Sequence, residues 1–170
     1  TKHTDKLLEV VSDCVLDPVF PEAEFVKIKN QTISSLQQEK DDPSSIARNV
    51  ASVLNYGKDF PYGENTTEKT LNNATLDQCI SHYKTYFKPN NAYLIVGGGI
   101  ISEEAIFYAE KYFGSLAPGD VPKQVYNIPL APEKPTVNVV NKDGAVQSVV
   151  YITYPIVLKP GSADALTVSV

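Results

Sequence analysis

The chain has 170 residues, of which 42% are hydrophobic and 21% are charged, a composition typical of a globular protein and unlike that of disordered or collagen-like chains. Fifteen basic and twenty acidic residues give a net charge of −5, and Arg48 is the only arginine, which argues against nucleic-acid binding. Uninterrupted apolar runs extend over only a few residues, far short of the roughly 20 that cross a bilayer, so no membrane span is predicted.

Three consecutive helices are predicted in the first third of the chain. Apolar residues recur at helical spacing over residues 3–17, and Pro18 ends this pattern. A second helix runs from about residue 22 to residue 40, and a third follows Asp41-Asp42-Pro43, a sequence typical of a helix start. The second helix is expected to turn one face inward, made of Phe25, Ile28, Thr32, Ser35 and Leu36.

The middle of the chain combines a loop, a helix and a strand. Residues 55–65 have turn chemistry without periodicity and are interpreted as an ordered loop, followed by a short turn over residues 67–71. Thr75 and Gln78 form a capping-box pattern for a helix that extends to about Phe87. Residues 92–96 are a β-prone run and predict a strand.

Another helix, capped by Ser102 and closed by Gly114, follows a run of three glycines. Five of the twelve prolines lie in residues 118–135, which indicates an extended connector. Beyond it, residues 136–141 and 146–154 predict two strands joined by an Asp-Gly turn, and Ser162 is expected to cap a further helix. The order of elements predicts an α+β fold, with helices layered on a mainly antiparallel sheet.

No catalytic or metal-binding constellation emerges from the residues themselves. His3 and His82 lie far apart, and neither has a second histidine at helical or hairpin spacing, so no zinc motif is present. His82 is expected to face solvent. Neither Cys14 nor Cys79 has a histidine near it in the sequence, and residues 97–99 lack the spacing of a phosphate-binding loop.

An ordered set of short strings does resemble a known family. These strings are Leu16-Asp17-Pro18-Val19-Phe20, Glu39-Lys40-Asp41-Asp42-Pro43, Phe60-Pro61-Tyr62-Gly63 and Tyr86-Phe87-Lys88-Pro89-Asn90-Asn91-Ala92. Together they are similar to the pitrilysin/insulinase-type zinc peptidases, the family of mitochondrial processing peptidase. The resemblance implies that residues 1–117 are the C-terminal part of a peptidase-like α+β domain, that 118–135 are a connector, and that 136–170 begin the following homologous domain. The chain is then expected to be an excerpt of a longer polypeptide.

The resemblance also implies where a zinc site would be. Active members carry an H-x-x-E-H string, which supplies two histidine ligands and a glutamate base, and this chain has none. The third ligand of the family is a glutamate eight residues before the proline of Asp-Asp-Pro, which corresponds here to Ser35. A second family glutamate, seven residues earlier, corresponds to Ile28. Since neither residue is acidic, no catalytic residue and no zinc ligand is predicted in this chain, and zinc is expected in an active partner half.

Three functions remain open at this stage. The favoured one is an inactive half that binds and encloses peptide substrate, paired with a homologous catalytic half or subunit. The second is an active zinc metalloendopeptidase half whose H-x-x-E-H string lies upstream of residue 1. The third is a non-enzymatic assembly or scaffold protein. The resemblance leaves the compartment open, because the family occurs in cytosol, mitochondria and bacterial envelopes, and the bacterial periplasm or cell envelope is taken as a working hypothesis.

Overall fold

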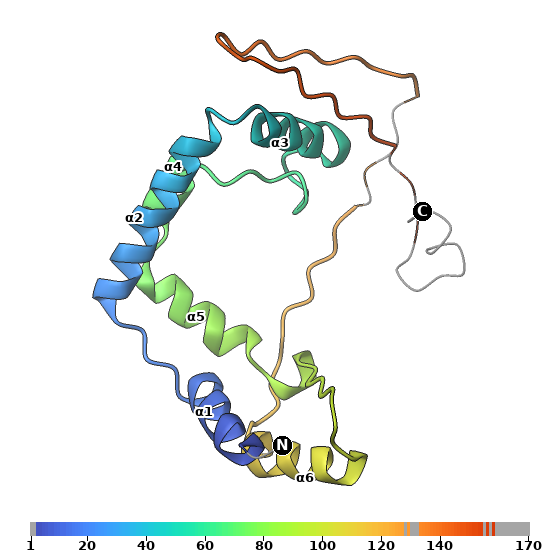
Figure 1. Cartoon of the computed structure of the whole chain (residues 1–170). Helices are drawn as coiled ribbons and strands as arrows, with labels where there is room; N and C mark the ends of the chain where they lie inside the picture. Colours follow the sequence, from blue (N-terminus) through green and yellow to red (C-terminus); the bar gives the residue numbers. More distant parts are fainter. Residues whose placement is uncertain (1–2, 128, 130–132, 155, 157, 159–170) are drawn as a thin grey trace. The chain divides into compact units, whose positions relative to one another are not determined.

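The computed structural model describes residues 3–127, 129, 133–154, 156 and 158, and every regular element in these residues is helical (Figure 1). The elements in chain order are α1 (Thr4–Leu16), α2 (Glu22–Glu39), α3 (Pro43–Tyr56), α4 (Glu68–Asn73), α5 (Leu76–Tyr86), the 3-10 turn η1 (Pro89–Asn91) and α6 (Ser102–Phe113). The helices predicted between residues 3 and 114 therefore form, with ends within a residue or two of those expected, and the short turn expected over residues 67–71 lies largely within α4.

Local capping explains several of these ends. The Asp42 carboxylate accepts hydrogen bonds from the Ser44 and Ser45 backbone N–H groups at 3.4 and 2.8 Å, which starts α3. Thr75 and Gln78 form the predicted capping box at the start of α5. The prediction for Ser102 was wrong, because Ser102 is the first helical residue of α6 and no side chain caps that end.

The predicted sheet was wrong as well. Residues 92–96, 136–141 and 146–154 form no strand in the described part of the chain, so the predicted α+β fold was wrong and the regular structure there is helical. The Asp-Gly turn does form, with Gly144 at φ 76° and the Ala145 N–H donating to the Lys142 carbonyl, but the flanking arms do not pair. Val137, Val139, Val146 and Val150 are largely exposed, so neither arm has an apolar face packed on a core. Because an isolated hairpin is marginal in water, β-prone residues alone do not make a sheet here.

The chain divides into two compact units, Thr1–Asn30 with Asn72–Gln124 and Gln31–Leu71 with Val125–Val170. The polypeptide passes between them within α2, within α4 and after residue 124. The predicted domain limits, 1–117, 118–135 and 136–170, stay a prediction, and the helix expected from Ser162 lies outside the described residues.

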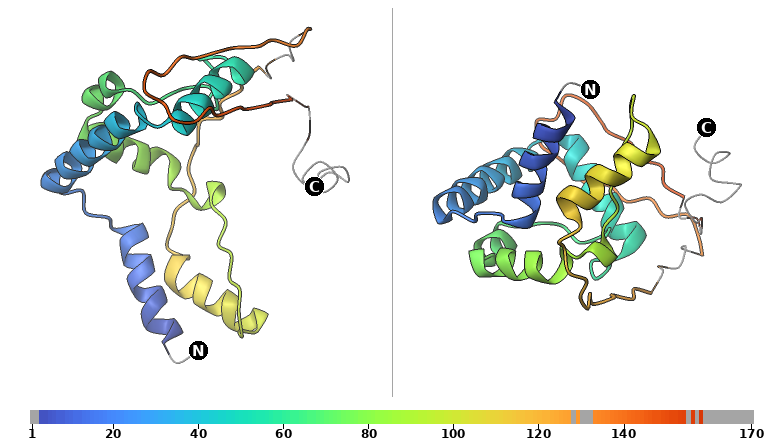
Figure 2. Two further views of the ribbon diagram at one scale, coloured as in Figure 1. Left: turned by 45° about the horizontal axis from the view of Figure 1, so that its top comes forward. Right: turned by 90° about the horizontal axis from the view of Figure 1, so that it is seen from below.

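In the first unit, α1 lies beside α6 (Figure 2). The Tyr83 hydroxyl of α5 donates to the carbonyl oxygens of Val15 and Leu16, at 2.6 and 3.1 Å, at the end of α1. The Lys29 ammonium donates to the Asn72 and Ala74 carbonyl oxygens at 2.8 and 3.0 Å, where α4 ends. Polar ties between helices thus organise this unit.

The second unit is held in a similar way. Lys40 pairs with Glu68 at 2.6 Å, and Lys142 pairs with Asp41 at 2.6 Å just before α3. At the other end of α3, the Thr153 hydroxyl donates to the Asn55 side-chain oxygen at 3.0 Å. The extended residues between Lys142 and Thr153 are therefore attached near both ends of α3.

Full burial is rare throughout the described residues. No apolar side chain among them is buried, and only Ser12 and Ser45, at 7% and 8% exposure, are close to fully covered among polar residues. The helices pack through half-buried faces and leave many large apolar side chains in contact with solvent.

Candidate functional site

The positions that the family resemblance singled out lie on α2. This helix has 18 residues, about 27 Å of length, and begins with Glu22 and Glu24 in its first turn, where acidic side chains favour the helix dipole. One side of the helix is half-buried, and it consists of Phe25, Lys29, Thr32, Ile33 and Leu36. The predicted inward face was therefore right for Phe25, Thr32 and Leu36 and wrong for the other two residues.

Ile28 and Ser35 are both exposed, Ile28 at 58%. Seven residues are nearly two helical turns, so the two positions point in about the same direction from α2, as expected. Ser35 offers a neutral hydroxyl and Ile28 offers no donor atom, so this pair provides no carboxylate to a metal. The nearest acids on α2 are Glu24, which is paired with Lys27 at 3.2 Å, and Glu39, one turn beyond Ser35.

Zinc sites in proteins use three or four nitrogen, sulfur or carboxylate donors. Over residues 3–127, 129, 133–154, 156 and 158, no group of three or more His, Cys, Asp or Glu side chains is placed to hold a metal ion. The donors on α2 therefore do not fit a zinc ion. The absence of zinc ligands and of catalytic residues in this chain stays a prediction.

The other candidate ligands are dispersed. His82 is exposed on α5, as expected, and its ring contacts that of Tyr86 at 4.6 Å. His3 is exposed at the N-cap of α1 and makes no side-chain capping hydrogen bond. Cys14 and Cys79 are exposed free thiols. The described structure brings none of these residues into a metal-binding group.

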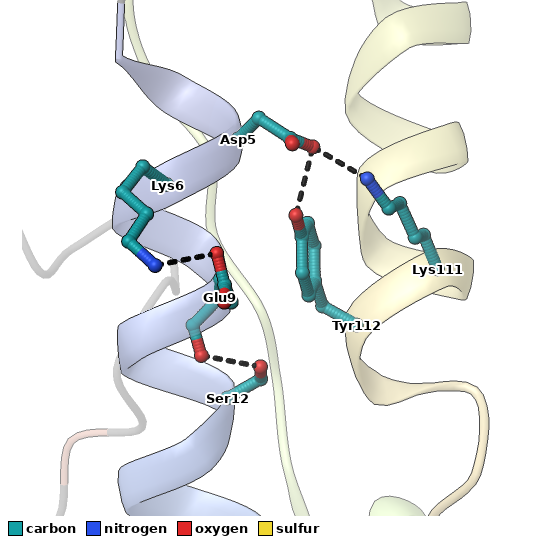
Figure 3. Close-up of polar contacts among 6 residues, drawn as sticks. All are labelled: Asp5, Lys6, Glu9, Ser12, Lys111 and Tyr112. Atoms are coloured by element: carbon teal, nitrogen blue, oxygen red, sulfur yellow. Dashed lines mark hydrogen bonds and ion pairs between the residues drawn. The ribbon is translucent and has the colours of Figure 1, made fainter.

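One polar cluster was not foreseen from the sequence. The Asp5 carboxylate on α1 accepts hydrogen bonds from the Lys111 ammonium at 2.7 Å and the Tyr112 hydroxyl at 2.8 Å on α6 (Figure 3). The Lys111 ammonium also lies 4.8 Å from the centre of the Tyr112 ring. No local pattern predicts this cluster, because its two halves lie more than a hundred residues apart in the sequence.

The pKa shifts in this cluster indicate that its hydrogen bonds stabilise the contact between α1 and α6. The hydrogen bond from Lys111, followed by that from Tyr112, lowers the pKa of Asp5, and the hydrogen bond to Asp5 raises the pKa of Lys111. Desolvation, followed by the hydrogen bond to Asp5, raises the pKa of Tyr112. All three pKa values therefore lie further from 7 than usual, that of Asp5 below it and those of Lys111 and Tyr112 above it. None is therefore suited to proton transfer near pH 7.

The adjacent acids Asp41 and Asp42 also have structural partners. The pKa of Asp42 is lowered by its hydrogen bonds with Ser45, and the pKa of Asp41 is lowered chiefly by its hydrogen bond with Lys142. One carboxylate caps α3 and the other holds the turn at Lys142. Both carboxylates therefore have structural partners in the described part of the chain.

Comparisons with known proteins agree with the resemblance. Residues 73–170 match the family described as the peptidase M16 inactive domain. A protein of Rickettsia felis (strain ATCC VR-1525 / URRWXCal2), described as an uncharacterized zinc protease, is 25% identical over 122 residues. One of Rickettsia bellii (strain RML369-C), with the same description, is 26% identical over 124 residues. Each alignment covers 71% of this chain and 29% of the relative, so the chain spans less than a third of these relatives.

None of the helices in the described residues is both long and apolar enough to span a membrane.

Proposed function

Since the chain belongs to the peptidase M16 inactive-domain family, we propose that it is part of a non-catalytic half of a pitrilysin-type zinc peptidase. In this proposal it binds and encloses peptide substrate while a homologous active half performs hydrolysis. The observation that carries the proposal is the chemistry of Ile28 and Ser35, which stand on α2 where the family resemblance expects two glutamates. Without those carboxylates, this helix supplies no third zinc ligand.

The exposed apolar side chains of the chain support the proposal that it associates with a partner half. No apolar side chain is buried in the described residues, and large apolar side chains such as Leu7, Ile106 and Phe107 are more than half exposed. Exposed apolar area of this extent favours association with other protein surface. The partner expected is a catalytic half, in the same polypeptide or in another one.

The test uses the intact protein that contains this chain, purified alone and together with a catalytic M16 half from the same organism. Zinc per chain is measured by plasma mass spectrometry, and hydrolysis is followed with an unfolded protein such as carboxymethylated casein. For the protein alone we expect no zinc above background and no hydrolysis. For the protein together with its partner we expect substrate binding, and hydrolysis faster than that of the catalytic half alone. Near one zinc per chain in the protein alone would overturn the proposal. Failure to bind any unfolded peptide, with or without the partner, would favour a scaffold instead.

A second candidate is an active zinc endopeptidase half, which the descriptions of the two rickettsial relatives as zinc proteases favour. It requires the third ligand to be Glu39 instead of the residue at position 35, a shift of four residues against the Asp-Asp-Pro anchor. The variant Glu39→Gln separates the two. Zinc content and hydrolysis should be lost in Glu39→Gln if the second candidate holds, and unchanged if the first does. Glu22→Gln, at the other end of α2, is the matched control.

A further inference from the structure

Residues 142–153, here named the strap, lie along α3 in the second unit, where Figure 1 and Figure 2 show them stretched out beside the helix. The Lys142 ammonium pairs with the Asp41 carboxylate at 2.6 Å, just before α3 begins. The Thr153 hydroxyl donates to the Asn55 side-chain oxygen at 3.0 Å, one residue before α3 ends. The strap is therefore attached at both ends of a single helix.

The attachment at Thr153 belongs to a packed part of the strap. Alternate side chains of a stretched chain point to the same side, so Thr153, which contacts α3, shares its side with Tyr151 and Val149. Those two residues are 48% and 37% exposed, whereas their neighbours Ile152 and Val150 are 75% and 79% exposed. This end of the strap therefore rests on the protein through one face.

The turn at the other end of the strap is much less covered. A Cβ added to Gly144 would meet nothing within 4 Å, and Val146 is 98% exposed. The Ala145 N–H donates to the Lys142 carbonyl, which closes the turn without joining it to α3. Among the hydrogen bonds and ion pairs of the described residues, the one that joins this turn to the start of α3 is that of Lys142 with Asp41.

The two attachments differ in how they respond to salt. The Asp41 side chain is 80% exposed, and an ion pair open to solvent is weak and screened by ions, with a Debye length of about 10 Å at 0.1 M and about 3 Å at 1 M. The attachment at Thr153 consists of a neutral hydrogen bond and an apolar contact face. Salt therefore weakens the attachment at the turn and spares the other one.

We propose that the strap opens from its turn end, with the Lys142–Asp41 pair as its latch and the packed residues near Thr153 as its hinge. Opening frees the Asp41 carboxylate at the start of α3 and moves the turn away from the helix. Low ionic strength favours the closed form. All of these contacts lie within the second unit, so the latch is independent of the first unit.

Trypsin cleavage after Lys142 in the whole chain reports the open latch directly. The Lys142 ammonium cannot pair with Asp41 and fill the specificity pocket of the protease at the same time, so the cleavage rate follows the fraction of open molecules. Asp41→Asn leaves the cleaved sequence unchanged and is expected to raise the rate by about 1.5- to 5-fold, the range for an exposed ion pair. Asp59→Asn removes the same charge from an exposed residue of the same unit and should leave the rate unchanged.

Thr153→Val tests which end of the strap opens. The substitution keeps nearly the same side-chain shape and removes the hydrogen bond to Asn55. If the strap opens from its turn end, the rate of cleavage after Lys142 stays that of the wild type. If the strap detaches as a whole, the rate rises in Thr153→Val as it does in Asp41→Asn.

Salt provides a test that needs no substitution near the cleaved bond. Raising the salt concentration from about 0.05 M to about 0.5 M should speed cleavage of the wild type relative to a synthetic peptide of residues 137–148, and should not do so in Asp41→Asn. An unchanged rate in Asp41→Asn, an equal increase in Asp59→Asn or Thr153→Val, or a salt response that Asp41→Asn retains would overturn the proposal.

Discussion

Tyr83 ties α5 to the end of α1, and its replacement by phenylalanine should loosen that end while keeping the ring in place. The hydroxyl donates to the carbonyl oxygens of Val15 and Leu16, which belong to the last turn of α1, where carbonyl groups lack partners within the helix. The ring itself contacts Phe20 and Phe87, with centroids 5.7 and 4.9 Å apart. Tyr83→Phe removes only the hydrogen bonds, a net loss of about 1 kcal/mol.

A loss of this size corresponds to about fivefold more frequent opening of the end of α1. Amide hydrogen exchange resolved by residue measures it, and we expect the amides in the last turn of α1 to exchange about fivefold faster in Tyr83→Phe, with little change in α3. Tyr86→Phe is the matched control, because among the described residues no hydrogen bond of the Tyr86 hydroxyl is found and its ring contacts His82. Wild-type exchange rates in Tyr83→Phe, or an equal acceleration in Tyr86→Phe, would refute the reasoning.

Three further predictions concern local structure. Gly63→Ala should disrupt the loop of residues 56–63 and reduce the near-UV circular dichroism of its aromatic side chains, because the new Cβ would overlap the Gly57 carbonyl oxygen, whereas Gly97→Ala, with open space around it, should not. The Asp5–Lys111 tie should hold between about pH 4 and pH 10: Asp5, with a lowered pKa, loses its contribution as pH falls below 3.8, and Lys111, with a raised pKa, loses its contribution as pH rises above 10.5. An NMR titration in which the α6 resonances stay unchanged both well below pH 3.8 and well above pH 10.5 would contradict this. Thr75→Ala should destabilise α5 by about 1 kcal/mol in urea denaturation, while Thr75→Ser keeps the cap.

Local chemistry determined most of what the sequence predicted correctly. Pro18 cannot continue α1, Asp42 accepts from the first free N–H groups of α3, and Thr75 with Gln78 does the same for α5. Each of these signals lies within three or four residues of the end that it sets. Ser102 shows the limit of such signals, since a good capping residue stands one position inside the helix that it was expected to cap.

The features that the sequence did not predict depend on residues far apart in the chain. A strand exists only with a partner for its backbone, and β-prone residues at 92–96 and 146–154 meet no such partner in the described part of the chain. The cluster of Asp5 with Lys111 and Tyr112 has the same character, because it joins the first and last helices of one unit. Sequence periodicity carries no information on such pairings.

The candidate positions on α2 were located by counting from the Asp-Asp-Pro anchor, and this assignment stays a prediction, whereas the predicted inward orientation of Ile28 and Ser35 was wrong. The spacing of seven residues between Ile28 and Ser35 places both on one side of the helix, whichever side packs. Periodicity then assigned that side to the interior, because Ile28 is apolar and stands near Phe25 and Thr32. In the structure the packed side is rotated toward Lys29 and Ile33, which are both half-buried.

The exposure of Ile28 and Ser35 decides whether packing excludes an acidic residue at either position. A carboxylate in place of a buried residue would be costly, but Ser35 is exposed and Ile28 is 58% exposed, and substitutions at such positions usually change stability by less than about 0.5 kcal/mol. Packing therefore does not prevent glutamate at either position. Ile28→Glu with Ser35→Glu should leave the folded state intact in urea denaturation, which would separate the requirements of the fold from those of zinc binding. Packing thus allows two acids on this side of α2, and it does not explain why Ile28 and Ser35 stand there instead.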